Sequence, residues 1–146
     1  MTYEQCKKQA ISDLAQYNYL RISLSTLPPQ IELLQSVRMS DAADMDAASH
    51  SAQLKSRLET NMLKIRCIEA ALDALSDEEK ELLNSYYIAR QRTAVNNYAR
   101  KNYTHRSCVY RRIHRALDKY ILAYFGISPT KYTKQHSAIL KFCVSV

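Results

Sequence analysis

Apolar residues recur at nearly regular intervals over the first part of the chain, close to a seven-residue repeat. This stripe predicts a long amphipathic helix over about residues 3–27. We expect Pro28 and Pro29 to stop it, because proline lacks an N–H donor and disfavours helical geometry in the residue before it. Pro29 can equally begin a short second helix, whose apolar side would be Ile31, Leu34 and Val37. The residues of the first stripe are Tyr3, Cys6, Ala10, Ile11, Leu14, Tyr17, Leu20, Leu24 and Leu27.

A second apolar seam over residues 52–75 predicts another long helix. We expect it to pack on the first as an antiparallel hairpin, which would make residues 1–75 one helical segment. A homodimeric coiled coil through residues 3–27 and 52–75 is the alternative, and periodicity alone does not separate the two. The intervening stretch Ser40–Ser49 is small, polar and acidic, which indicates a linker or a frayed helix start. The seam consists of Leu54, Leu58, Met62, Ile65, Ile68, Leu72 and Leu75.

The residues from 76 to 126 open with a capping box. Ser76 can accept a hydrogen bond from the backbone N–H of Glu79, while the Glu79 side chain reaches back. Asp77, Glu78 and Glu79 also lie where the helix dipole favours negative charge, and this accounts for the acidic cluster without any catalytic role. The buried side of this helix would be Leu82, Leu83, Tyr86 and Ile88.

A short helix, a tight turn and a longer helix follow in the pattern. The short helix is predicted over residues 94–101 with Thr93 as its N-cap, and Asn102 is expected to turn the chain because asparagine tolerates the left-handed conformation. Thr104 or Ser107 would cap the longer helix, which ends near Phe125 with Gly126 beyond it. Its inward positions would be Val109, Ile113, Ala116, Leu117 and Tyr120. This order is typical of a helix-turn-helix, whose second helix enters the DNA major groove.

The composition supports an all-α fold. One glycine and three prolines among 146 residues leave few positions for hairpin turns, while 47% hydrophobic residues suffice for a core. No apolar run is long enough to span a membrane, and the N-terminus lacks the apolar core of a secretory signal. The four scattered cysteines are predicted to be reduced and structurally buried. We therefore expect a cytoplasmic protein.

The net charge of +7 is concentrated in one segment. Residues 1–89 carry nine Lys/Arg against thirteen Asp/Glu, whereas residues 90–119 carry nine against one. The last residues, 120–146, add three lysines and no acid. Because a surface tuned only for solubility would intersperse both signs, the cluster favours a polyanionic partner such as nucleic acid.

The sequences LSDEEKELLNSYYI and VNNYARKNYTHRSCVYRRIHRAL, within about residues 75–126, resemble the C-terminal DNA-binding region of sigma factors, region 4, which reads the −35 promoter element. In particular they are similar to the small phage-encoded late-gene transcription activators of the ArpU/RinA type. The resemblance implies an all-α protein with a leading helical segment before a sigma-like helix-turn-helix, binding double-stranded DNA in a bacterial host cell. It also implies RNA polymerase as a partner. Tyr103 occupies the turn position that usually holds glycine.

The helix-turn-helix pattern divides the basic residues into two groups. The residues near the start of the longer helix and opposite its apolar side are candidates for reading base edges, where an arginine fork on guanine is the commonest specific contact. Other cations are candidates for phosphate contacts. Tyr110 has two readings: a contact with a thymine methyl, or packing against the short helix. The base-reading candidates are Arg106, Ser107, Tyr110, Arg111 and His114, and the phosphate candidates are Arg92, Arg100, Lys101, Arg112, Arg115 and Lys119.

The sequence lacks the motifs of a catalytic or cofactor site. It has no glycine-rich phosphate loop and no HExxH motif, and its histidines lack the company of other metal ligands. We therefore expect no enzyme activity, metal or cofactor. The alternatives to a DNA-binding regulator are a helical interaction protein whose basic helix binds an acidic protein, and an RNA-binding protein. Residues 127–146 form a basic tail outside the resemblance.

Overall fold

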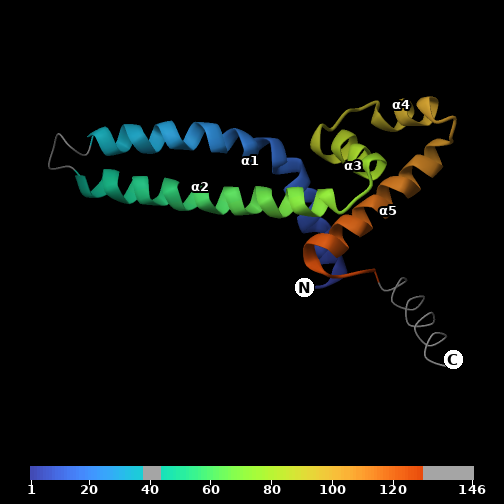
Figure 1. Ribbon diagram of the computed structural model, residues 1–146, viewed down its shortest axis with the longest axis horizontal. Coiled ribbons are helices and arrows are strands. Elements are labelled where there is room, and N and C mark those ends of the chain that lie inside the picture. Colours follow the sequence, from blue (N-terminus) through green and yellow to red (C-terminus); the bar gives the residue numbers. More distant parts are fainter. Residues whose placement is uncertain (38–43, 130–146) are drawn as a thin grey trace, which may run out of the picture. The chain divides into compact units, whose positions relative to one another are not determined.

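The computed structural model describes residues 1–37 and 44–129, and within them every regular element is helical (Figure 1). The predicted all-α fold class is confirmed. A π-helical turn, η1, joins α3 to the loop before α4. The elements are α1 (Tyr3–Val37), α2 (Asp44–Asp73), α3 (Asp77–Leu83), η1 (Asn84–Ile88), α4 (Ala94–Lys101) and α5 (Arg106–Phe125).

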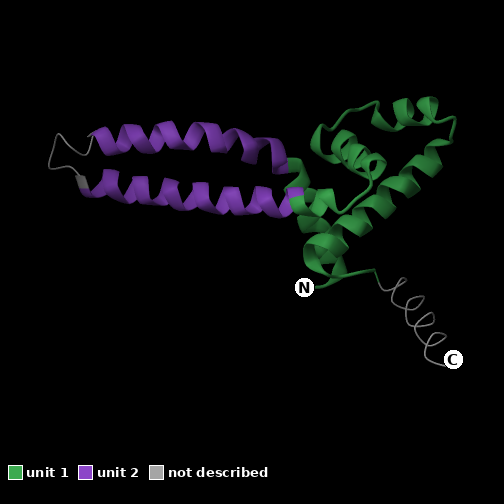
Figure 2. Cartoon of the chain, viewed as in Figure 1, with its two compact units in different colours: residues 1–15, 70–146 green, residues 16–69 purple. Residues whose placement is uncertain are grey.

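The chain forms two compact units (Figure 2). One comprises residues 16–69, and the other combines residues 1–15 with the chain from Ala70 onward. The sequence instead predicts a domain boundary between residues 75 and 76. The amino-terminal part of α1 belongs to the unit that continues from Ala70 onward (green in Figure 2), where Cys6, Ala10 and Leu14 are fully buried and the Tyr3 hydroxyl donates to Asp118 of α5. Of the predicted basic tail, residues 130–146 lie outside the described residues.

The unit of residues 16–69 is an antiparallel helical hairpin within one chain. Tyr17 donates a hydrogen bond to Glu69 at 2.7 Å, and Asn61 donates one to Ser23 at 2.9 Å. Residue numbers therefore rise along α1 as they fall along α2, as predicted for the hairpin. The homodimer stays a prediction, although its proposed seam already packs within the chain. The packed cluster consists of Leu27, Ile31 and Leu54, with Leu34 and Leu58 beside it.

The predicted helix stop at Pro28 and Pro29 is wrong, because α1 continues through both prolines to Val37. The two missing N–H donors remove two intrahelical hydrogen bonds, at a cost of roughly 3 kcal/mol or more per proline. Leu27 and Ile31 flank the prolines and are both buried against Leu54 of α2. Packing on both sides of the prolines thus holds the segment helical where local preference favours a break.

For Ser40–Ser49 the sequence predicts a linker or a frayed helix start, and the helix start is confirmed from Asp44 on. Residues 38–43 lie outside the described residues, but α2 already begins at Asp44, well before the predicted start at residue 52. Ala47 and Ala48 favour a helix by propensity, and the negative charge of Asp46 suits a helix amino terminus. The helix also ends at Asp73, two residues before its predicted end.

Helices α3, α4 and α5 pack around an apolar cluster, and together with η1 they are called the helix-turn-helix unit. Leu82, Val95, Val109 and Ile113 form its centre, and Tyr86, Tyr87, Tyr98 and Ala99 pack against it. All the inward positions predicted for α5 are buried, so the predicted orientation of this helix is confirmed. The buried residues of α5 are Val109, Ile113, Ala116, Leu117, Tyr120 and Ile121.

The helix ends follow the predictions in part. The Ser76 hydroxyl accepts the Glu79 N–H at 3.3 Å and donates to the Glu79 carboxylate at 2.8 Å, so the capping residue is confirmed. Gly126 ends α5 in the left-handed conformation with φ 71°, as expected of a C-terminal glycine. Thr93 holds the N-cap position of α4, but its side chain makes no capping hydrogen bond.

The predicted cap of α5 is wrong, since His105 rather than Thr104 or Ser107 holds the N-cap position. His105 is extended, with φ −75° and ψ 150°, and its carbonyl accepts the N–H groups of Cys108 and Val109. The helix therefore begins at Arg106 through backbone bonds, without a capping side chain.

Tyrosine ionisation should make the unit of residues 1–15 and 70 onward less stable in alkali. Burial, together with the nearby Tyr86 and Asp118, raises the pKa of Tyr87 to about 12. Burial and the hydrogen bond to Asp118 raise the pKa of Tyr3 above its usual range. The unfolded chain loses these protons first as pH rises above the ordinary tyrosine pKa of about 10, so stability should fall between about pH 10 and 12.

The check is a series of thermal melts across this pH range. Tyr87→Phe should reduce the pH slope of the unfolding free energy by up to about one proton. Tyr19→Phe, at an exposed tyrosine of α1, is the matched control for the loss of a tyrosine hydroxyl. An unaltered slope in Tyr87→Phe would contradict the assignment.

Candidate nucleic-acid interface

The five base-reading candidates all lie in the first half of α5, and all are exposed. Ser107, Arg111 and His114 follow one another at spacings of four and three residues, which places them on one helical face. Val109 and Ile113 of the same helix point into the core. The structure therefore brings this predicted group together on a surface rather than dispersing it. The other two members are Arg106 and Tyr110.

Tyr110 is packed, but not against the predicted partner. Its ring meets Tyr86 of η1 edge-on, with 6.3 Å between centroids, and Tyr86 in turn meets Tyr87 at 4.9 Å. The side chain retains 37% exposure. Tyr110 therefore extends the core aromatic cluster to the surface beside Arg111, and its exposed edge is available to a ligand there.

Four of the phosphate candidates are exposed and form no ion pair within the part of the chain that the structure describes. Arg100 and Lys101 lie in the last turn of α4, while Arg92 precedes this helix. Arg115 lies one helical turn after Arg111 on α5, so it continues the same exposed side. These cations remain available to an external anion.

Arg112 is instead held by its own chain. Its guanidinium lies 3.3 Å from the Glu78 carboxylate of α3 and donates to the Tyr98 hydroxyl of α4 at 2.9 Å. The same guanidinium lies over the Tyr98 ring, 5.8 Å from its centroid, and the Tyr98 hydroxyl donates to Glu78. This network ties α3, α4 and α5 together, and a phosphate would have to compete with Glu78 for Arg112.

Lys119 is paired in a similar way. Its ammonium lies 3.0 Å from the carboxylate of Glu79. Burial opposes ionisation of Glu79, but the hydrogen bonds from Lys119 and Ser76 outweigh it and lower the pKa of this carboxyl. Glu79 is therefore ionised at neutral pH. Exposed pairs of this kind contribute roughly 0–1 kcal/mol each, so their main effect is to occupy two cations.

These pairs were missed by reasoning from the sequence, which gave the acids of α3 only a capping role. Glu78 and Arg112 are 34 residues apart, and Glu79 and Lys119 are 40 apart. No local spacing rule connects positions so distant, because the fold alone brings them together.

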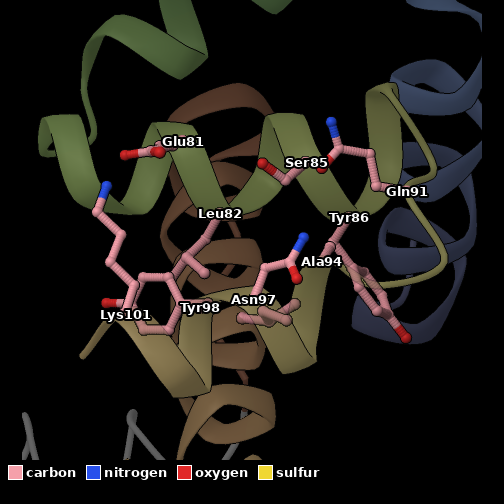
Figure 3. A pocket seen from close by; sticks show the side chains of 10 residues that line it. Glu81, Leu82, Ser85, Tyr86, Gln91, Ala94, Asn97, Tyr98 and Lys101 are labelled. Atoms are coloured by element: carbon pink, nitrogen blue, oxygen red, sulfur yellow. The ribbon is translucent and has the colours of Figure 1, made fainter. Parts of the chain in front are cut away.

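A pocket of about 140 Å³ opens between the α3–η1 segment and α4 (Figure 3). Its apolar lining includes Leu82, Tyr86 and Tyr98. Its polar lining includes Glu81 from α3 and Lys101 from α4, which Figure 3 shows at the same end. Lys101 therefore belongs both to the basic surface and to the rim of this pocket.

The turn between α4 and α5 differs from its prediction. Asn102 has φ −106°, and Tyr103 rather than Asn102 adopts the left-handed conformation, with φ 52°. The Asn102 side chain instead donates to the Tyr98 carbonyl at 3.0 Å. The turn closes as predicted over residues 102–104, with a different residue at its special backbone position.

The cysteines of the described residues differ in burial. Cys6 is buried as predicted, but Cys67 and Cys108 are exposed, so the prediction of burial is wrong for them, and Cys143 lies outside the described residues. In residues 1–37 and 44–129, no three His, Cys, Asp or Glu side chains are grouped so that they could hold a metal ion. None of the described helices is long and apolar enough to cross a membrane.

Comparison with known proteins finds no matching family model, no matching curated protein and no matching solved structure.

Proposed function

We propose that the protein is a sequence-specific double-stranded DNA-binding transcriptional regulator, and that it activates phage or prophage genes. The observation that carries the proposal is the exposed face of α5, on which Ser107, Arg111 and His114 follow a short helix and a tight turn. Arg106 and Arg115 lie on the same helix as these three residues, and the sequence holds no acidic residue between Glu81 and Asp118.

The division of labour follows from helix-turn-helix geometry. The amino-terminal residues of the second helix contact base edges in the major groove, while flanking cations contact phosphates. Arg111 lies opposite the buried Val109 and Ile113, so it is assigned to the bases. Lys101 and Arg115 are assigned to phosphates. No enzymatic step, metal or cofactor is part of this proposal.

The resemblance to sigma factors extends the proposal to RNA polymerase as a partner, in the bacterial cytoplasm. Homodimerisation is a separate proposal. Since the apolar seams of residues 16–69 pack within one chain, a dimer would need other faces of these helices.

The test is a paired titration on duplexes: a preferred site from oligonucleotide selection and a scrambled control. Arg111→Ala should cost roughly 1–3 kcal/mol on the preferred site and much less on the scrambled one. Arg115→Ala is the matched control on the same helix and should weaken both duplexes alike.

Equal losses on both duplexes for Arg111→Ala would overturn its base-reading role. If the parent protein binds RNA or an acidic protein better than any duplex, the DNA-binding proposal falls.

A further inference from the structure

The turn before α5 imposes a backbone conformation that tyrosine adopts at a cost. The Asn102 N–H donates to the Tyr98 carbonyl and the Thr104 N–H to the Ala99 carbonyl, both at 3.0 Å. Such a helix ending places one residue in the left-handed region, usually glycine or asparagine. Here that residue is Tyr103, with φ 52°, where its Cβ crowds the following carbonyl oxygen.

The Tyr103 side chain offers no compensation within the described part of the chain. It is 96% exposed, and it makes no hydrogen bond, ion pair or ring contact with any residue in the described ranges. No contact within the described residues therefore offsets the backbone strain at Tyr103 or the exposure of its aromatic ring. Strain of this kind, observed in a structure, directs attention to a partner.

The surroundings identify the chemistry of that partner. Arg100 and Lys101 precede Tyr103, Arg106 follows it, and all three are exposed. An aromatic ring among cations matches nucleic acid, which offers phosphates beside the apolar faces of sugars and bases. An acidic protein surface offers the charge without the apolar faces.

We infer that Tyr103 contacts duplex DNA at the border of the site read by α5, packing its ring on the sugar-phosphate strand that flanks the major groove. This inference rests on the proposed function. Tyr103 lies three residues before the first residue of α5, and the amino-terminal end of a recognition helix is the end that enters the groove. The residue would thus add a contact outside the base-reading face.

The experiment compares Tyr103→Asn, Tyr103→Gly and Tyr103→Phe in the full chain, by thermal melts and by titration with the preferred duplex and its separated strands. Asparagine and glycine relieve the strain, so the melting temperature should rise by about 3 °C. The same two variants should lose about fivefold or more in duplex affinity. Tyr103→Phe retains the ring and should bind like the parent. Tyr19→Gln, at another exposed tyrosine, should leave affinity unchanged.

The outcomes separate the inference from the proposed function. If the parent binds the duplex and Tyr103→Asn binds equally well, the inference is overturned while the DNA-binding proposal stands. A lower melting temperature in both the Asn and the Gly variant would assign the Tyr103 ring a structural role, and this result would also overturn the inference. A loss confined to single strands would refute the placement on duplex DNA, and a parent without duplex affinity would refute the proposed function itself.

Discussion

Leu117→Asp should unfold the helix-turn-helix unit. Leu117 is fully buried, so the substitution removes an apolar side chain and forces an unpaired carboxylate into the core. The loss should be about 5 kcal/mol or more, which equals the total stability of many domains. Circular dichroism during thermal melting of the full chain measures it.

Leu122→Asp is the matched control, since it makes the same change on the same helix. Leu122 is 51% exposed, and the substitution should shift stability by no more than about 0.5 kcal/mol. Ile113→Asp, at a second buried position of α5, should repeat the effect of Leu117→Asp. An unchanged melting temperature in both buried variants would show that α5 is rotated from the orientation described above.

The orientation of α5 was predictable because helical periodicity encodes it directly. Val109, Ile113 and Leu117 recur at four-residue steps, and only one face can collect all three. Gly126 and Ser76 were predictable for a similar reason, since a helix end selects residue types by local backbone geometry. Features that depend on neighbours along the chain can thus be predicted from the sequence alone.

The incorrect predictions concern features that depend on residues far apart in the sequence. The passage of α1 through Pro28 and Pro29 depends on the packing of Leu27 and Ile31 against Leu54. Local rules see only the missing N–H donors. The π-helical turn η1 and the backbone-only start of α5 likewise carry no characteristic residue that reasoning from the sequence could use.

The candidate interface also has features that local sequence predicts and features that only the fold determines. Exposure of the base-reading face follows from periodicity, whereas the capture of Arg112 and Lys119 by Glu78 and Glu79 requires the fold. The sequence pattern predicts phosphate contacts for Arg112 and Lys119 as it does for the other candidates. The structure makes them the two that must first leave an internal partner before they can contact DNA.

This distinction sets the expected salt dependence of binding. Each phosphate neutralised by a cation releases counterions, so log K falls with log[salt] at a slope of about −0.9 per phosphate. If about five phosphates are neutralised by one recognition unit, the slope should be roughly −4 to −5, and twice that for a dimer. Between about 50 and 200 mM salt, affinity should then fall by a few hundredfold or more. A nearly salt-independent affinity would contradict the basic surface as the binding surface.

The ion pairs can be tested within the same measurement. Glu78→Gln and Glu79→Gln together release Arg112 and Lys119, so the slope should steepen by up to about two if both cations reach phosphates. Asp77→Asn removes one negative charge from the same helix, at an exposed residue that forms no ion pair within the described ranges, and it separates the release of specific cations from a change in overall charge. A steeper slope only in the paired variants would identify Glu78 and Glu79 as internal competitors of phosphate. An equal change in all variants would instead reduce their effect to net charge, and Arg112 would remain a structural link between α3, α4 and α5.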